Sequence, residues 1–158
     1  MQVYVMKLVT GTIGSAGFAI LFGLRGKKMV LATCGGALSL GICLFCQMNG
    51  MGPAASLFFG SFAGSVMGEV LARVVKAPVL SFLVPMLIPL VPGSSLYNTM
   101  YALINDRYEE FGPNSSLVLE KGAAIAMGLI TASYGAHLLM RIYHQLMVSK
   151  GKTPPHPH

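Results

Sequence analysis

The stretch that decides the fold is Pro78-Val-Leu-Ser-Phe-Leu-Val-Pro-Met-Leu-Ile-Pro-Leu-Val-Pro-Gly-Ser-Ser-Leu-Tyr-Asn-Thr-Met100, inside a run from Ala77 to Asn105 without a charged residue. Such a run can cross a bilayer, because a membrane-spanning helix needs about 20 apolar residues. Its three interior prolines each remove a backbone donor, which kinks or breaks a helix. A kinked helix with only a packing role would fit them, but the Gly-Ser-Ser that follows favours a new helix start. We therefore predict a span broken at Pro92-Gly93.

The composition is that of an integral membrane protein. Of the 158 residues, 54% are hydrophobic and only 10% are charged, whereas soluble domains carry about 25% charged residues. The net charge of +6 comes without a basic run interleaved with aromatic residues, so it predicts membrane topology signals and no nucleic-acid surface. We expect an all-α membrane protein, one bundle of about five transmembrane helices.

Charged links and turn residues divide the chain into spans. The first span is expected to be retained, since no convincing signal-peptide cleavage site follows it. A polar link is expected at 106–116, and a flexible cytoplasmic tail at 149–158. The predicted transmembrane domain covers residues 1–148, with spans at about 3–24, 29–46, 54–75, 77–105 and 117–143.

Three spans carry a small residue at every fourth position, a pattern that lets helices approach closely in lipid. The residues are Gly11, Ser15, Ala19 and Gly23 in the first span, Ser56, Gly60, Gly64, Gly68 and Ala72 in the third, and Ala124, Gly128, Ala132 and Ala136 in the fifth. The pattern does not distinguish packing within the bundle from packing in a homo-oligomer or against a partner subunit.

The basic residues alternate between links, which sets the predicted orientation. The links after the first and third spans are basic, as is the tail, whereas the links after the second and fourth spans are not. The positive-inside rule therefore places the N-terminus outside and the C-terminus in the cytoplasm. A re-entrant hairpin at Pro92 would leave the basic tail outside, so we expect a full crossing.

The break predicts an anion site. Counting within the uncharged run places Pro92-Gly93 near the bilayer midplane, with a half-helix that begins near Ser94 and is capped by Ser94 or Ser95. A helix N-terminus offers free N–H groups and a partial positive charge to a substrate carboxylate. Tyr97 and Asn98 could bind a hydroxyl or amine. The predicted substrate-binding residues are Pro89, Pro92, Gly93, Ser94, Ser95, Tyr97 and Asn98.

Two titratable residues inside the spans are candidates for proton coupling, Glu69 and His137. Glu69 lies one helical turn from Arg73, which favours an ion pair over a proton carrier. A lone histidine near a span end is more often structural. The Cys43-Leu-Phe-Cys46 pair lacks partners for a zinc site, and we predict no catalytic residues, metal or cofactor.

The motif Pro89-x-x-Pro-Gly-x-x-x-Tyr-x-x-Met100 resembles a signature of the threonine/serine exporter (ThrE) family, in its C-terminal, YjjB-type half. The resemblance implies export of small amino or carboxylic acids across the bacterial cytoplasmic membrane, driven by the proton motive force. Members export threonine and serine or succinate-like dicarboxylates. It also implies a partner subunit, the YjjP-type half, so this chain is expected to be one part of a two-component exporter.

Other classes of protein fit the sequence less well. A membrane scaffold or assembly subunit would suit the small-residue faces but not a polar break inside a span. A membrane enzyme would need catalytic groups, and neither His-Glu-x-x-His nor Gly-x-Ser-x-Gly is present. A channel would need a charged ring or a filter-like carbonyl motif, and the spans offer neither.

Overall fold

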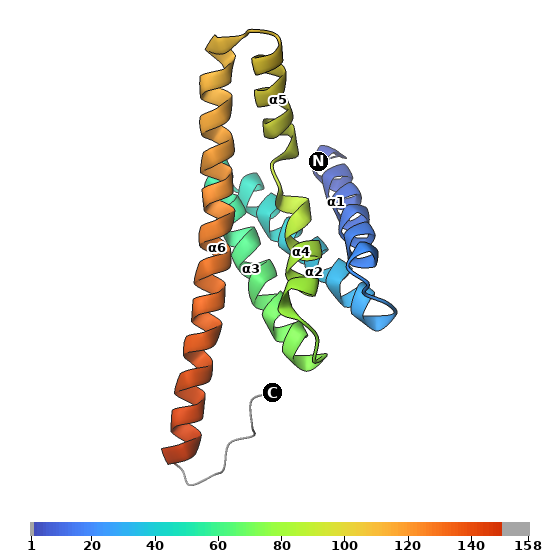
Figure 1. The fold of residues 1–158 in the computed structure, drawn as a ribbon, viewed down its shortest axis with the longest axis vertical. Helices are drawn as coiled ribbons and strands as arrows, with labels where there is room; N and C mark the ends of the chain where they lie inside the picture. Colours follow the sequence, from blue (N-terminus) through green and yellow to red (C-terminus); the bar gives the residue numbers. More distant parts are fainter. Residues whose placement is uncertain (1, 150–158) are drawn as a thin grey trace.

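A computed structural model describes the backbone of residues 2–149 and the side chains of residues 2–136 and 138. Within these residues all the secondary-structure elements are helices (Figure 1). The elements are α1 (Gln2–Leu21), α2 (Lys27–Met48), α3 (Pro53–Val74), α4 (Val79–Leu87), the short 3₁₀ helix η1 (Ile88–Leu90), α5 (Gly93–Ile104) and α6 (Tyr108–Ser149).

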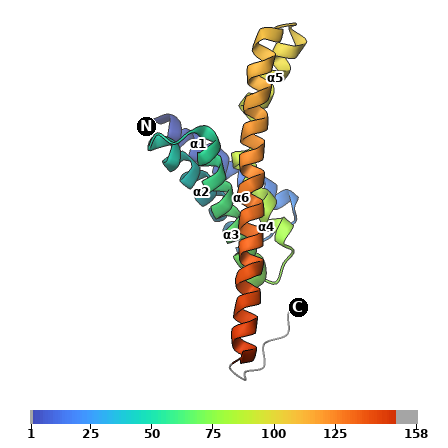
Figure 2. The ribbon, with the colours of Figure 1, turned by 90° about the vertical axis from the view of Figure 1, so that its left-hand side faces the viewer.

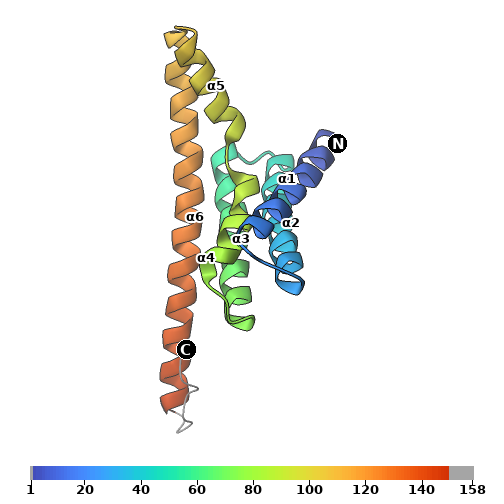
Figure 3. The same ribbon diagram turned by 45° about the vertical axis from the view of Figure 1, so that its right-hand side comes forward.

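The helices form a body and a projecting hairpin. In the body, α2 packs between α1 and α3, α4 lies against all three, and α6 runs along α3 (Figures 1 and 3). The hairpin consists of α5 and the first part of α6, which pack on each other beyond the body (Figure 2). We call the end of the body where α3 begins the Pro53 end and the opposite end the Val74 end.

The expected number of spans is confirmed. Four helices are long and apolar enough to cross a membrane, and a fifth crossing is obtained if the bent pair α4–η1 and α5 is counted as one span. The two parts of this pair meet at an angle of 62°, and α5 continues beyond α4 instead of folding back beside it (Figure 1).

The small-residue faces pack inside the chain. On α3, a Cβ added at Gly60 would lie 2.9 Å from the Ser39 carbonyl oxygen of α2, and the Ser39 hydroxyl donates a hydrogen bond of 2.8 Å to the Gly60 carbonyl. On α6, Gly128 lies directly against Ser61 of α3. On α1, Gly11 touches Leu40 of α2. These faces thus account for the close packing of the body.

The prolines of the broken span produce a gradual change of helix type. Pro85 lies inside α4, Pro89 lies in η1, and Pro92 is the residue before α5. The span packs along α3 in a regular register, in which Leu83, Leu87 and Leu90 of the broken span lie beside Gly68, Gly64 and Gly60 respectively.

This register gives the position of the break relative to the body. Since Leu90 is level with Gly60, Pro92 lies level with the first turns of α3, which begins at Pro53. The break therefore lies between the middle of the body and its Pro53 end. The part of the span before the break, α4 and η1, packs in the body, whereas α5 projects beyond it (Figure 3).

α6 is longer than the predicted span. It has 42 residues, which at 1.5 Å per residue is about 63 Å, twice the roughly 30 Å hydrocarbon core of a bilayer. It begins at Tyr108, so most of the predicted link 106–116 is helical despite Pro113. Of the predicted tail at 149–158, Ser149 is the last residue of α6 and residues 150–158 lie outside the described residues.

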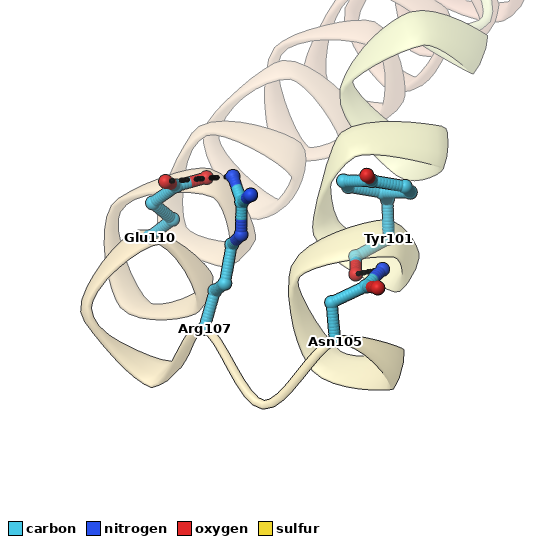
Figure 4. A network of polar contacts seen from close by, with 4 residues as sticks. All are labelled: Tyr101, Asn105, Arg107 and Glu110. Carbon is cyan, nitrogen blue, oxygen red and sulfur yellow. Dashed lines mark hydrogen bonds and ion pairs between the residues drawn. The ribbon is translucent and has the colours of Figure 1, made fainter.

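A short turn closes the hairpin (Figure 4). The Asn105 amide donates a hydrogen bond of 2.8 Å to the Tyr101 carbonyl at the end of α5. The Arg107 guanidinium lies 5.9 Å from the centre of the Tyr101 ring and 3.5 Å from the Glu110 carboxylate. Asp106 adopts a left-handed conformation with φ of 55°. These contacts fix where α6 starts and hence which of its residues face α5.

Candidate functional site

A partly open cavity of about 320 Å³ adjoins the break in the fourth span. Its volume is at the lower end of the roughly 300–1,000 Å³ typical of small-molecule sites. Its polar side chains come from four helices: Lys7, Gln47, Ser94 and Lys121. The remaining lining residues are apolar or weakly polar: Leu40, Cys43, Leu44, Pro53, Leu57, Pro89, Leu90, Val91 and Pro92.

Lys121 connects α6 to the first turn of α5. Its ammonium group donates a hydrogen bond of 2.7 Å to the Ser95 hydroxyl, and the Ser95 carbonyl accepts a bond of 2.8 Å from the Thr99 hydroxyl. Lys121 is half-buried. Because Ser95 is neutral, this contact leaves the positive charge of the lysine uncompensated.

The first turn of α5 carries unpaired donors beside the cavity. Pro92 is the N-cap residue and no side chain caps the helix, so the predicted cap by Ser94 or Ser95 is wrong. The Ser95 hydroxyl is instead bound to Lys121. Among the described residues, no acceptor is paired with the backbone N–H of Ser94 or of Ser95. Such N–H groups, with the helix dipole, favour an anion.

The cavity is electropositive. Two lysines line it and no aspartate or glutamate does. Neither Lys7 nor Lys121 takes part in an ion pair within the described part of the chain. Lys121 is half-buried and Lys7 is exposed, so the charge of Lys121 is the less screened of the two. The arrangement can hold a small anion by charge and by hydrogen bonds.

The seven predicted substrate-binding residues divide into two groups. Pro89, Pro92 and Ser94 line the cavity, and Ser95 is joined to it through Lys121. Gly93, Tyr97 and Asn98 are exposed and do not line it. Tyr97 is 68% exposed and stacks on Tyr101 with ring centres 6.1 Å apart.

The proton-coupling candidates lie away from the cavity. Glu69 is buried toward the Val74 end of α3, where its carboxylate accepts a bond of 2.9 Å from Arg73. The structure therefore contains the expected ion pair one helical turn apart. The side chain of His137 lies outside the described residues.

Sequence reasoning missed three polar residues of the cavity: Lys7, Gln47 and Lys121. Lys7 lies near the start of the first span, where a lysine can snorkel to the membrane interface, so its position gave no signal of a site. Lys121 lies within the predicted fifth span, where a charged residue is a functional candidate by default. That signal could have identified it, although its partner Ser95 is 26 positions away in sequence.

Two other grooves on the surface are apolar. One is lined by α2 residues alone and the other lies between α1 and α2. Both lack the charges and free donors of the cavity at the break. Apolar grooves on membrane helices suit contact with lipid chains, so the cavity at the break is the candidate site.

Four long apolar helices, a broken fourth span and a polar cavity at the break define a multi-pass membrane protein of the transporter type. A sequence model of the family described as Threonine/Serine exporter, ThrE, matches residues 7–134. The chain belongs to this family, which confirms the membership that the proline-glycine signature predicts. Searches of curated proteins and of solved structures found no match.

Proposed function

We propose that this chain is one subunit of a two-component exporter of small amino or carboxylic acids. The observation that carries the proposal is the electropositive cavity beside the break, with the free N–H groups of α5 and the two lysines. A carboxylate is the group that such donors bind. The family description supports export as the direction of transport.

The cavity lies toward one side of the body, which suits alternating access. Between the cavity and the Val74 end, the broken span is packed tightly. Phe82 and Met86 are fully buried in a cluster with Ala19, Ala32 and Ala72. Met86 lies directly against Gly35 of α2. In this proposal the cluster is the closed gate, and the cavity opens toward the Pro53 end.

We propose that the Val74 end faces the cytoplasm of a bacterial cell, with the N-terminus outside. The basic residues Arg25, Lys27, Lys28, Arg73 and Lys76 lie in or beside the links at that end, as the positive-inside rule requires. The hairpin of α5 and α6 would then project outward.

A cysteine-labelling experiment tests this orientation. In a variant without its native cysteines, Glu109→Cys at the start of α6 should react with a membrane-impermeant maleimide added to intact cells. Lys28→Cys, the matched control at the other end, should react only after the membrane is permeabilised. The reverse pattern would contradict the proposed orientation.

The partner in this proposal is the YjjP-type half of the family, and the driving force is the proton motive force. The scaffold alternative is weaker than the sequence alone suggested, because the small-residue faces pack within the chain and a scaffold has no need of an electropositive cavity. The exposed apolar surface of α1 is compatible with contact to a second copy of the chain in a homo-oligomer.

Efflux from proteoliposomes tests the proposed function. We expect labelled threonine, serine or succinate to leave vesicles that contain this chain and the YjjP-type half, faster with an imposed pH gradient. Vesicles with either subunit alone are the control. Efflux from this chain alone would contradict the two-component assignment. No efflux of any of the three from folded protein with its partner would contradict the proposed function.

A further inference from the structure

We propose that Lys7 and Lys121 select the substrate by charge, so that the cavity favours a dicarboxylate dianion over a zwitterionic amino acid. This inference rests on the proposed function, in that it takes the cavity at the break as the substrate site. It adds the chemical class of the substrate and the two residues that determine it.

The first argument is charge balance. The cavity contains two ammonium groups from different helices, one on α1 and one on α6, and no carboxylate. A dicarboxylate would neutralise both charges. An amino acid brings one carboxylate and one ammonium group, and the ammonium group would be placed near two lysines. Like charges that share one cavity repel, and the repulsion is stronger than in bulk water where a charge is half-buried, as that of Lys121 is.

The second argument concerns the other polar groups. An ammonium group requires acceptors, and the cavity offers few of them. The Ser94 and Ser95 N–H groups are donors, and the Ser95 hydroxyl already accepts from Lys121. The Gln47 amide nitrogen contacts Cys43 Sγ at 3.5 Å, so the side-chain acceptors that remain are both neutral, the Gln47 oxygen and the Ser94 hydroxyl. A neutral acceptor does not offset the repulsion from Lys7 and Lys121.

The third argument concerns what Lys121 gains on binding. In the structure its ammonium group donates to a neutral hydroxyl. A substrate carboxylate would replace that partner with an oppositely charged one, which adds the attraction between two full charges to the hydrogen bond. Ser95 is therefore a competitor of the substrate for Lys121, and the substrate carboxylate would release α5 from α6 at this point.

The test uses the full chain co-reconstituted with the YjjP-type half, with labelled succinate and threonine as probes. We expect Lys7→Gln and Lys121→Gln each to raise the succinate concentration at half-saturation about tenfold or more, the usual effect of losing a hydrogen bond to a charged group. The threonine concentration at half-saturation should rise by less than about twofold, because the lysine that is lost also repelled the ammonium group of threonine. Lys28→Gln, which changes an exposed lysine in the first turn of α2, is the matched control and should change neither.

Two further variants separate charge recognition from a structural role of the Lys121–Ser95 contact. Ser95→Ala frees Lys121 and should leave succinate affinity equal to wild type or higher, opposite to the effect of Lys121→Gln. Lys121→Arg retains the charge and should keep the preference for succinate. If Ser95→Ala and Lys121→Gln lower the affinity for succinate equally, the Lys121–Ser95 contact is structural and the inference is wrong.

Failure of this inference differs from failure of the proposed function. A wild-type complex that exports threonine and serine in preference to succinate would overturn charge selection but leave export intact. Lysine variants that lower the affinities for succinate and threonine equally would likewise overturn charge selection and leave export intact. A folded complex that transports neither probe nor serine would contradict the proposed function, and the inference with it.

Discussion

Replacing Gly128 with leucine is expected to destabilise the protein by about 3 kcal/mol or more, because overpacking a close contact forces backbone to move. Gly128 lies where α6 crosses α3. A Cβ added there would lie 2.7 Å from the Phe58 carbonyl oxygen and 3.0 Å from the Phe62 backbone nitrogen, and it would also meet the Ser61 hydroxyl. Backbone atoms cannot rotate away as a flexible side chain can, so α6 would have to separate from α3.

Gly122→Leu is the matched control for this prediction. Gly122 lies on the same helix, and a Cβ added there would meet nothing within 4 Å. Its replacement should be neutral or slightly stabilising, because glycine costs about 1 kcal/mol in a helix interior. The difference in stability is measured by heating the two purified variants in detergent and monitoring their unfolding by size-exclusion chromatography. Equal stability would show that α3 and α6 do not approach as closely as described.

The membrane class and the broken span could be predicted from the sequence because both depend on local chemistry. Uncharged runs of sufficient length indicate spans wherever they occur, and a proline disrupts a helix whatever surrounds it. The small residues at every fourth position also predicted close packing, because this pattern can be recognised within a single helix. The sequence could not assign their partners, because Gly60 and Gly128 meet different helices through tertiary register.

The cavity could not be predicted from the sequence because it depends on the hairpin register. The predicted fifth span began at residue 117, after a polar link, which would place Lys121 near a membrane surface. In the structure, α6 begins at Tyr108, and the short turn at 105–107 aligns Lys121 with Ser95. A change of a few residues in the start of α6 would rotate Lys121 away from α5.

The positions of Tyr97 and Asn98 illustrate the same limit at the break. After a bend of 62°, the rotation of α5 about its own axis is set by its contact with α6. Ser95, Thr99 and Ala102 are its less exposed residues and recur at helical spacing. Tyr97 and Asn98 therefore lie outside that face. The small residues at this spacing were the signal that could have shown which side of α5 is packed.

Removal of the arginine from the Glu69–Arg73 pair is expected to be far more damaging than removal of the glutamate. The Glu69 side chain is 5% exposed and the Arg73 side chain is 36% exposed. Arg73→Gln would leave a buried carboxylate unpaired, which costs about 3–5 kcal/mol when a buried pair is broken. Glu69→Gln would leave an arginine near the end of α3 that can reach water, so we expect a loss below about 1 kcal/mol.

The double variant Glu69→Gln/Arg73→Gln should recover most of the stability lost by Arg73→Gln, because no charge is then left buried. Arg107→Gln is the control, since the Arg107–Glu110 pair has side chains 55% and 57% exposed, and exposed pairs contribute about 0–1 kcal/mol. The thermal unfolding measurement used for the Gly128 variant applies here. Equal destabilisation by the two single substitutions would contradict the predicted asymmetry.

The same variants distinguish the two roles considered for Glu69. If its carboxylate serves only to pair with Arg73, Glu69→Gln protein in complex with the YjjP-type half should still export faster under an imposed pH gradient. The reason is that an amide at this position can keep a hydrogen bond to Arg73 but cannot carry a proton. We expect the gradient dependence to be retained. Efflux that continues but no longer responds to the gradient, from protein of normal stability, would instead make Glu69 the proton carrier and its pairing with Arg73 one state of the transport cycle.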